Sequence, residues 1–457
     1  MVRFIVKFGG SNLKSAADIR RSTEVVRAYG CPVVVVVSAF AGITDRLIHA
    51  IGEAALALSS IDAVIEALRR IHRDALVAHV TDAERRTAVL DVIEARLSGL
   101  DRLLRGVHYI GSSPDFVTDA VLACGERLSA PVIAAALIDL GIDAVEALPE
   151  DIGLLTDGVH GSATALTGAS TAAVAAALGG DRTRVVPGFY GIGKDGKTTL
   201  FGRGGSDYTA AVIARCVGAA SLDLWKDVDG FLSCDPRIAS DSRTIPYLTY
   251  EEAAELSYFG AKIFHPRTVE PLEGDAIPVR VMNVTRFAGA IEPYTTVGPS
   301  LGERVIDPRV IKSVASTDEI AVVRLEGPVV GSRPGILARA TSRLDAAGVN
   351  ISSVITAQTS INLIFRSGDL PRALAALQAD ATPGVLTVVP IEDVALVAAV
   401  GEGIRDRFGV AGRLMMAVAG EGVNVLMMQA GASPTAVYLI VHRDDRERTA
   451  RAIHDAV

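Results

Sequence analysis

The sequence predicts an α/β protein in which a large layered domain precedes two small α/β modules. Residues 3–8 form an apolar strand that ends at two glycines, and residues 33–37 are a continuous β-branched run. Such a run is typical of a strand buried on both faces of a parallel sheet. A glycine, helix and asparagine pattern occurs twice after residue 330, which indicates an internal repeat. A chain of 457 residues is also too long for one ordinary domain.

Composition and charge favour a globular protein that binds small molecules. Hydrophobic residues make up 49% of the chain and charged residues 21%, with a net charge of −8 and no long basic run. We expect no nucleic-acid partner, because such proteins usually carry a basic stripe. The cysteines are far apart and predict neither a disulfide framework nor a zinc site; they are Cys31, Cys124, Cys216 and Cys234.

The N-terminal residues 1–7 are typical of a strand rather than a signal peptide. The longest apolar runs, such as 32–37, are far too short to span a membrane. We therefore expect no membrane association and a cytoplasmic location.

The first elements follow one another as in a layered α/β domain. After the strand at 3–8, Ser15 is a suitable cap for a helix, and the buried strand at 33–37 comes next. From residue 45 to about 105 the apolar period is helical, with a break at Thr81-Asp82. The break divides the segment into two long helices, which are expected to form a helical layer or lid on the sheet.

The middle of the chain alternates between short strands, helices and glycine-rich turns. Helices and short strands alternate over residues 115–180. The later expected elements are a strand that runs into a glycine-rich loop over 185–191, a hairpin turning at 194–197, a helix at 208–217, a strand at 223–228 and a helix at 250–259. Pro299, Gly302 and Pro308 then indicate a linker.

The repeat beyond the linker predicts two similar modules. Gly335 precedes an amphipathic helix and the segment 348–351, and Gly409 precedes a similar helix and the segment 422–425. A strand follows each copy, at 360–365 and 435–441. Each module by itself is too small to be an enzyme, so catalysis is expected in the first domain.

The first candidate site is Lys7-Phe8-Gly9-Gly10-Ser11. Ligands of open α/β sheets bind at the carboxyl ends of the strands, where Lys7 lies. Gly9 and Gly10 let backbone N–H groups approach phosphate oxygens without a Cβ in the way. The segment is not a Walker A loop. A tight turn with a surface lysine is the alternative interpretation.

The second candidate site, Gly202 to Thr209, is the most telling feature of the sequence. The glycines around Arg203 leave its guanidinium as a bidentate partner for a carboxylate or phosphate. Ser206 and Asp207 come just before the helix expected at 208–217, and helix N-termini favour anions. In the alternative interpretation both residues merely cap that helix while Arg203 is exposed.

Three further segments carry polar residues in suitable places. Ser38 to Thr44 follows the buried strand, so its hydroxyl groups either face the same edge or form a cap and loop. Glu126, amid apolar residues, either holds a substrate ammonium or forms an ion pair on its own helix. Lys262 either reaches phosphate or complements the dipole of the helix before it.

Taken in order, these segments resemble the aspartokinases of the amino acid kinase family, over nearly the whole chain. The matching segments are Lys7–Ser11, Ser38–Thr44, Gly125–Glu126, Phe201–Ala210, Trp225–Arg237 and Phe259–Pro266, and the C-terminal repeat resembles paired ACT domains. The resemblance implies a three-layer αβα, carbamate kinase-like domain at 1–300. It also implies ferredoxin-like ACT domains at 301–390 and 391–457, with interleaving of the two as an option.

The resemblance implies transfer of the ATP γ-phosphoryl group to the β-carboxylate of L-aspartate, which gives 4-phospho-L-aspartate and ADP. Lysine, threonine and methionine biosynthesis all draw on this reaction. Because the β-carboxylate is already ionised at pH 7, no general base is needed. Alignment and charge neutralisation are then sufficient.

The resemblance also assigns a role to each candidate residue. Lys7 and Lys262 would neutralise the transferring group, and Asp207 would orient them and help organise phosphates that carry Mg²⁺. Ser38, Thr44, Glu126, Arg203 and Ser206 would bind the substrate. Gly9, Gly10, Ser11, Trp225, Lys226, Asp227, Leu232 and Arg237 would bind ATP. No metal is expected on the protein itself.

The chain departs from the usual pattern of this family in three places. Ser11-Asn12 stands where Thr-Ser is usual, Lys226 replaces the threonine of Trp-Thr-Asp, and Leu232 stands where tyrosine is common. The last two are expected to change nucleotide affinity and selectivity rather than the reaction.

An amino-acid effector is expected to bind the ACT modules at Ile336, Leu337, Asn350, Ile351, Gln358 and Asn424. Ser352 and Gln358 match positions that carry acidic residues in lysine-inhibited relatives, so threonine is favoured over lysine. ACT modules commonly pair side by side, which predicts a homodimer or a dimer of dimers.

Two other functions compete with this interpretation. One is a related kinase that acts on glutamate, carbamate or a nucleoside monophosphate, which the Gly202–Asp207 motif and the twin ACT repeat disfavour. The other is a catalytically idle, amino-acid-binding regulatory subunit. Retention of Lys7, Glu126, Arg203, Asp207 and Lys262 disfavours it.

Overall fold

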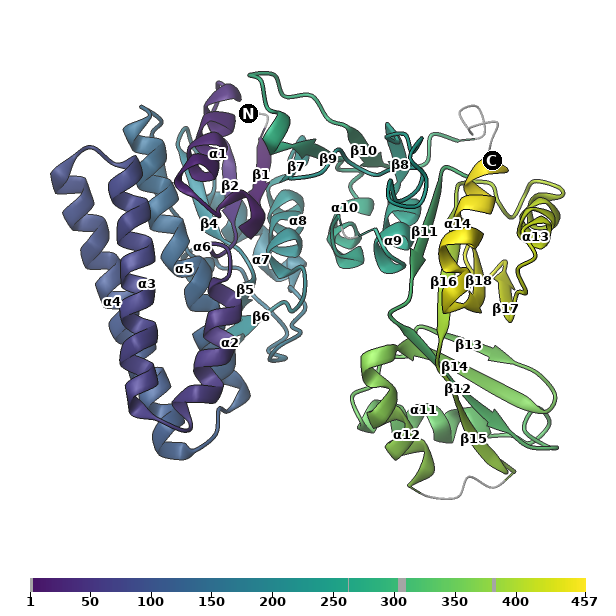
Figure 1. The fold of residues 1–457 in the computed structure, drawn as a ribbon. Coiled ribbons are helices and arrows are strands. Elements are labelled where there is room, and N and C mark those ends of the chain that lie inside the picture. Colours follow the sequence, from purple (N-terminus) through teal and green to yellow (C-terminus); the bar gives the residue numbers. More distant parts are fainter. Residues whose placement is uncertain (1–2, 262, 303–309, 380–383) are drawn as a thin grey trace. The chain divides into compact units, whose positions relative to one another are not determined.

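The computed structural model describes residues 3–261, 263–302, 310–379 and 384–457, which form two compact units. Unit 1 is made of residues up to Phe231, of Thr244–Ala254 and of the chain from Lys262 to Ser300. Unit 2 is made of Leu232–Arg243, Glu255–Ala261 and the chain from Leu301 onward. Figure 1 labels the elements of both. The domain boundaries at 300 and 390 stay predictions.

The centre of unit 1 is an eight-stranded sheet with the order β3-β4-β2-β1-β7-β9-β10-β8. Every neighbouring pair is parallel except β9 and β10. Its strands are β1 (Phe4–Phe8), β2 (Val34–Val37), β3 (Ala144–Glu146), β4 (Thr183–Pro187), β7 (Ser221–Lys226), β8 (Tyr247–Thr249), β9 (Val279–Asn283) and β10 (Thr295–Gly298). All four valines of β2 are buried, as expected for a strand covered on both faces.

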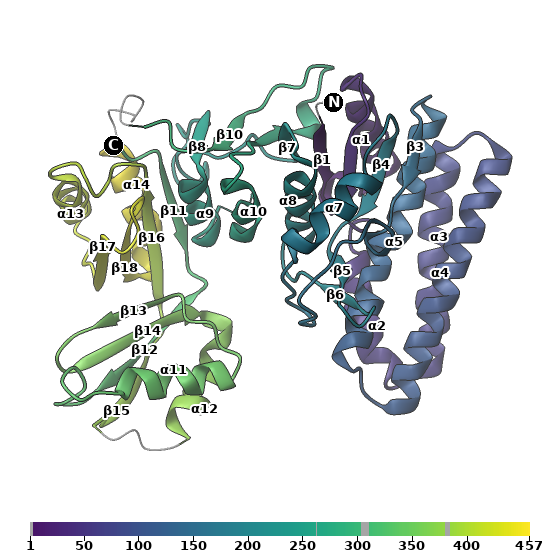
Figure 2. The same cartoon turned by 180° about the vertical axis from the view of Figure 1, so that it is seen from behind.

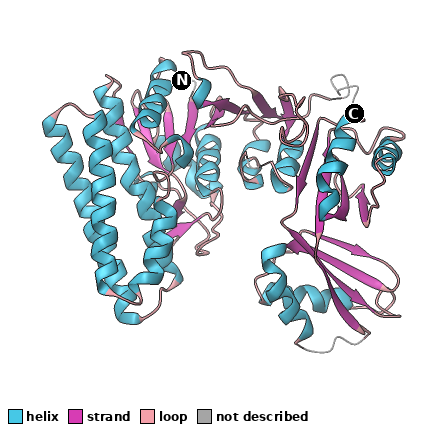
Figure 3. Ribbon diagram, in the orientation of Figure 1, coloured by secondary structure: helices cyan, strands magenta, loops and turns pink. Residues whose placement is uncertain are grey.

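Helices cover both faces of this sheet, so the predicted αβα fold is confirmed (Figure 3). One face carries α1 (Ala16–Ala28) and α5 (Asp115–Asp139), and the other carries α8 (Gly205–Val217) with α7 (Thr167–Ala177) beside it. The expected helical layer consists of α2 (Ile43–Ala54), α3 (Leu58–His79) and α4 (Ala83–Ile110), which pack on α5 (Figure 2). The remaining helices are α6 (Pro149–Ile152), α9 (Tyr250–Tyr258) and α10 (Glu270–Glu273).

Local sequence signals account for several helix ends. The Ser15 side chain accepts a hydrogen bond from the Asp18 N–H at the start of α1, and Asp82 does the same for Arg85 at the start of α4. The expected hairpin is present as β5 (Tyr190–Ile192) and β6 (Thr198–Leu200).

Two expected boundaries near the second candidate site are wrong. Helix α8 begins at Gly205, three residues before the expected start, because Gly204 has φ 72° and serves as the N-cap. Ser206 and Asp207 therefore lie inside the first turn. Strand β7 covers Ser221–Lys226 and ends earlier than expected, because its pairing with β9 ends at Lys226 and Asn283.

Unit 2 contains two antiparallel four-stranded sheets, each with two helices, so the twin ferredoxin-like modules are confirmed. The first has strand order β13-β14-β12-β15, with β12 (Ile320–Glu326), β13 (Ser353–Thr356), β14 (Ser360–Arg366), β15 (Thr387–Ile391), α11 (Ile336–Ala346) and α12 (Leu370–Gln378). The second has the order β11-β16-β18-β17, with β11 (Ser313–Thr317), β16 (Val394–Val400), β17 (Met427–Ala430), β18 (Ala436–His442), α13 (Val410–Gly420) and α14 (Arg446–Asp455). Gly335 and Gly409, both at positive φ, begin α11 and α13 in the same way.

Strand β11 comes before the first module in the chain but pairs with β16 of the second. The segment Leu232–Arg243 also contributes to the core of the second module. Cys234, Ile238 and Ala239 belong to the same buried cluster as residues of α13, β18 and α14.

Helix α5 is the one helix in the described part of the chain that is long and apolar enough to cross a membrane. However, 83% of its most apolar window is buried inside the protein. That burial identifies α5 as a core helix of unit 1.

Candidate active site

Two lysines lie on one buried carboxylate at the carboxyl edge of the unit 1 sheet. Lys7 Nζ is 2.5 Å from Asp207 Oδ1, and Lys226 Nζ is 2.9 Å from Asp207 Oδ2. Lys7 and Asp207 are 4% and 5% exposed, which excludes the surface lysine of the alternative interpretation. Asp207 is also more than a helix cap, because α8 has no side-chain cap.

The electrostatic balance favours the ionised form of this carboxylate. Burial alone raises the pKa of Asp207, but the charges of Lys226 and Lys7 outweigh burial and hold the pKa at about 2. Burial lowers the pKa of Lys7, against the favourable effect of Asp207. Two ammonium groups on one carboxylate leave one positive charge uncompensated, which suits an anionic ligand.

Glu126 places a second buried carboxylate near this site. It lies on α5 and is 3% exposed, and Ser206 Oγ donates to its Oε1 at 3.4 Å. A Cβ on Gly125 would stand 2.8 Å from the Ala39 Cβ, so glycine lets α5 approach the segment after β2. The Glu126 carboxylate is not paired with Arg127, the one arginine of α5, because Arg127 pairs with Glu150 at 3.0 Å.

The environment of Glu126 suits a cation that arrives with the substrate. Burial raises its pKa to about 7, although the Ala39 N–H, Lys7 and Ser206 favour the ionised form. Its Oε2 has no hydrogen-bond partner within the described residues. A carboxylate so placed gains a partner when an ammonium group binds.

The loop that carries Arg203 is fixed from two sides while Arg203 itself is exposed. Gly202 and Gly204 have φ of 76° and 72°, and a Cβ on Gly204 would meet the His265 Cβ at 2.4 Å. Arg267 lies over the Tyr208 ring and donates to the Phe201 carbonyl at 3.4 Å. The backbone is held, and the guanidinium of Arg203 stays accessible to a ligand.

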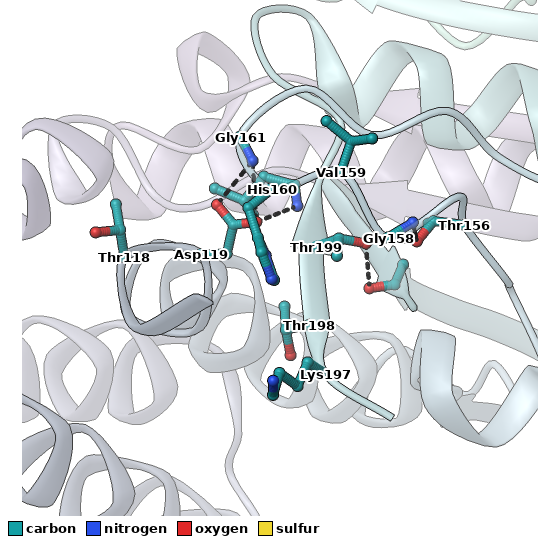
Figure 4. A network of polar contacts seen from close by, with 12 residues as sticks. Thr118, Asp119, Thr156, Gly158, Val159, His160, Gly161, Lys197, Thr198 and Thr199 are labelled. Atoms are coloured by element: carbon teal, nitrogen blue, oxygen red, sulfur yellow. Dashed lines mark hydrogen bonds and ion pairs between the residues drawn. The ribbon is translucent and has the colours of Figure 1, made fainter. Parts of the chain in front are cut away.

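A polar network around Asp119 and His160 lies next to this loop in the fold, and Figure 4 shows the network itself. The buried Asp119 carboxylate accepts bonds from the Gly161 and Leu200 N–H groups and lies 2.9 Å from His160 Nδ1. The Gly161 carbonyl in turn lies against Gly202, where a Cβ would stand 3.0 Å away. Asp119 thus connects α5 to the backbone on which Arg203 is placed.

The structure brings Lys7, Glu126, Ser206 and Asp207 together, with Ser38 next to them. Ser38 is half-buried, and Ser129 Oγ donates to its carbonyl at 2.8 Å. Thr44 is half-buried in the first turn of α2. Gly9, Gly10 and Ser11 form the turn after β1, where a Cβ on Gly9 would lie 3.3 Å from Lys7 Nζ.

Several predicted residues are not part of this cluster. The Trp225 indole is buried on the α1 side of β7 and donates to the Tyr29 hydroxyl at 3.2 Å. Asp227 is exposed. Leu232 and Arg237 belong to unit 2. Lys262 lies outside the described residues, so its role stays a prediction.

Sequence reasoning missed how Lys226 and Asn12 are used. It assigned Lys226 to ATP binding and treated both residues as departures from a pattern, but it predicted neither contact: Lys226 reaches Asp207, and the Asn12 side-chain amide donates to the Trp225 carbonyl at 2.6 Å. The period of two along β7 was the signal that could have placed Lys226 on the face of Leu224.

The described residues contain no group of three or more His, Cys, Asp or Glu side chains that could hold a metal ion. Both oxygens of Asp207 face ammonium groups, so this carboxylate is poorly suited to bind a cation directly.

A separate cavity of about 530 Å³ lies in the first module of unit 2. Its lining includes Ile336, Leu337 and Gln358 among the predicted effector residues, and contains no described acidic side chain. Asn350, Ile351 and Asn424 are not part of the lining.

Comparison with known proteins gives a consistent picture. The sequence profile of the amino acid kinase family matches residues 2–283, and that of an ACT domain matches residues 397–457. Aspartokinase 3, chloroplastic, of Arabidopsis thaliana is 31% identical over 468 residues, which cover 99% of this chain and 81% of the relative. The aspartokinase of Corynebacterium glutamicum is 29% identical over 467 residues, which cover 100% of this chain and 96% of the relative.

Solved structures agree with these matches. E. coli aspartokinase III in complex with aspartate and ADP aligns with a TM-score of 0.82 and 25% identity, covering 100% of both chains. The same enzyme in complex with lysine and aspartate aligns with a TM-score of 0.80, covering 99% of this chain and 98% of the other.

Proposed function

The chain belongs to the amino acid kinase family, and from that premise we propose that it is an ATP-dependent aspartate kinase that forms 4-phospho-L-aspartate and ADP. The observation that carries the proposal is the buried cluster of Lys7, Asp207 and Lys226 beside Glu126. It combines excess positive charge for phosphates with a buried carboxylate for an ammonium group. Relatives named aspartokinase extend over nearly the whole chain.

The proposed chemistry requires only positioning and charge neutralisation. Glu126 binds the substrate ammonium and Arg203 its α-carboxylate, which directs the ionised β-carboxylate towards the γ-phosphorus of ATP. The oxygen of that carboxylate forms the new bond to phosphorus while the bond to the ADP oxygen breaks. Lys7 neutralises the transferring group, and Asp207 holds the Lys7 ammonium in place.

Mg²⁺ is proposed to arrive on the phosphates of ATP rather than on protein ligands. It would reduce the negative charge on the phosphates, while Lys7 contacts the phosphate oxygens that remain. The engagement of Asp207 by two ammonium groups supports this arrangement.

The cavity in the first module is proposed to bind a feedback effector, with threonine favoured over lysine. A lysine side chain would bring its ammonium into a cavity whose described lining has no carboxylate and includes Arg333. Inhibition titrations test this: threonine should inhibit at lower concentration, and inhibition by lysine alone contradicts it. Dimerisation through these modules and a cytoplasmic location stay predictions.

Hydroxylamine trapping of the acyl phosphate tests the catalytic proposal. With ATP and a panel of amino acids, only aspartate should give a hydroxamate, and Lys7→Ala should abolish it. Hydroxamate from glutamate instead would indicate another kinase of the family, and none from any acid would indicate an idle subunit.

A further inference from the structure

Strand register places Lys226 on the same face of the sheet as Lys7. Lys7 pairs with Leu224 across the parallel strands β1 and β7, and Lys226 lies two residues further along β7. Val6 and Phe8 pack into the cluster on the α1 side, so Lys7 faces α8 on the other side. The first turn of α8 supplies Asp207, which both ammonium groups contact.

Asn12 holds the end of β7 immediately before Lys226. Asn12 is 1% exposed, and its side-chain amide donates to the Trp225 carbonyl at 2.6 Å. Ser22 Oγ donates to the Asn12 backbone carbonyl at 3.1 Å and fixes it against α1. The shorter side chain of serine, usual in the family at this position, extends less far towards the carbonyl.

Two of the departures from the family pattern, Asn12 and Lys226, are therefore joined by structure. We propose that Lys226 is a phosphate-binding residue of the transfer site and that Asn12 is a positioning residue that acts through it. Lys226 has N–H donors beyond the one that Asp207 accepts, and it is only 14% exposed. A second lysine is not needed merely to neutralise the charge of Asp207, because Lys7 already pairs with that carboxylate.

Binding of AMP, ADP and a non-hydrolysable ATP analogue, each with Mg²⁺, tests the role of Lys226. Calorimetry on the full chain should show that Lys226→Met weakens binding of the ATP analogue about tenfold or more, ADP less and AMP hardly at all. Lys226→Arg should recover part of the loss. The matched control is Lys197→Met, which removes a more exposed lysine that lies 3.2 Å from Asp195 in the turn between β5 and β6.

Two outcomes would overturn the assignment. An equal loss for all three nucleotides would place Lys226 at the base or ribose, and no loss would make it a structural ion pair only. If Lys226→Met does not fold, Lys226→Thr, which restores the residue usual in the family, provides the same measurement.

A double-mutant cycle tests the link to Asn12. Asn12→Ser should weaken binding of the ATP analogue several-fold in the wild-type background and hardly at all in Lys226→Met. Independent, additive losses would contradict the positioning role.

The inference rests on the proposed function but can fail separately from it. Nucleotide binding needs no aspartate, so a failed hydroxamate assay with intact Lys226 dependence would reject only the aspartate kinase. Normal hydroxamate formation with nucleotide binding insensitive to Lys226 would reject only this inference.

Discussion

The Glu126 carboxylate has to be both buried and ionised in order to bind an ammonium group. These requirements conflict, because burial makes ionisation of a carboxyl group costly. Burial raises its pKa to about 7. The substrate ammonium binds the ionised form, so the KM for aspartate should fall about tenfold per pH unit from 5.5 towards 7 and then level off. Glu126→Gln should bind weakly at every pH. A pH-independent KM in the wild type would contradict this.

The raised pKa of Glu126 also determines how the stability of the protein depends on pH. A folded-state pKa above the ordinary value of 4.5 means that the folded protein holds its proton more tightly than the unfolded chain. Stability contributed by this group is therefore present below pH 4.5 and lost as pH rises through about 7. Glu126→Gln should stabilise the ligand-free protein by about 1–3 kcal/mol at pH 8 relative to its effect at pH 4. Urea unfolding at both pH values measures the difference.

A substitution at Arg203 should change substrate binding without changing the stability of the fold. Lysine cannot reproduce a bidentate contact, so Arg203→Lys should raise the KM for aspartate about tenfold. Because Arg203 is exposed, the free energy of unfolding should change by less than about 0.5 kcal/mol. Arg102→Lys, at an exposed position on α4, is the control and should leave KM unchanged. A loss of stability in Arg203→Lys would indicate a structural role instead.

At the scale of elements, the start of α8 depends on the close approach of two segments at Gly204. Alanine there would adopt a left-handed conformation and place its Cβ 2.4 Å from the His265 Cβ. Gly196, in the turn between β5 and β6, also has positive φ but has nothing within 4 Å of a Cβ. Gly196→Ala should cost about 1 kcal/mol of stability, and Gly204→Ala about 3 kcal/mol or more together with most activity. Equal costs would mean that the contact with His265 is easily relaxed.

Most elements near the site could be predicted because their signals are local. The apolar run of β2, the Ser15 cap and the turn between β5 and β6 each depend on a few adjacent residues. The start of α8 could not be predicted in this way, because Gly204 lies against His265, which is far along the chain and leaves no room for a Cβ. The ends of β1, β2 and β7 converge by sheet topology, which brings Lys7, Ser38 and Lys226 near one another. The pairing of Lys226 with Asp207 depends on strand register, which a short sequence motif does not contain.

At the scale of the whole molecule, segments that follow one another in the sequence can belong to different units. The twin modules were predictable because the glycine and asparagine pattern is repeated within the chain. The allocation of Leu232–Arg243 to unit 2 was not, since this segment continues directly from unit 1 and carries no repeat. Ser313 Oγ donates to the Leu232 carbonyl at 2.7 Å, and Arg451 Nε donates to the Ile238 carbonyl at 2.9 Å. Such contacts between distant residues cannot be read from composition or periodicity.

Two isoleucines close together in the chain should therefore report on different units. Ile238 and Ile245 are each 6% exposed, but Ile238 packs in the cluster of the second module, whereas Ile245 belongs to unit 1 and donates its N–H to the Phe231 carbonyl at 2.8 Å. Calorimetric unfolding should resolve two transitions, with ADP and aspartate raising the one that belongs to unit 1. Ile238→Ala should lower only the other transition, by a cost of about 2–4 kcal/mol, and Ile245→Ala should lower only the ligand-sensitive one. If Ile238→Ala lowers the ligand-sensitive transition alone, the segment belongs energetically to the kinase unit and its allocation to unit 2 is wrong.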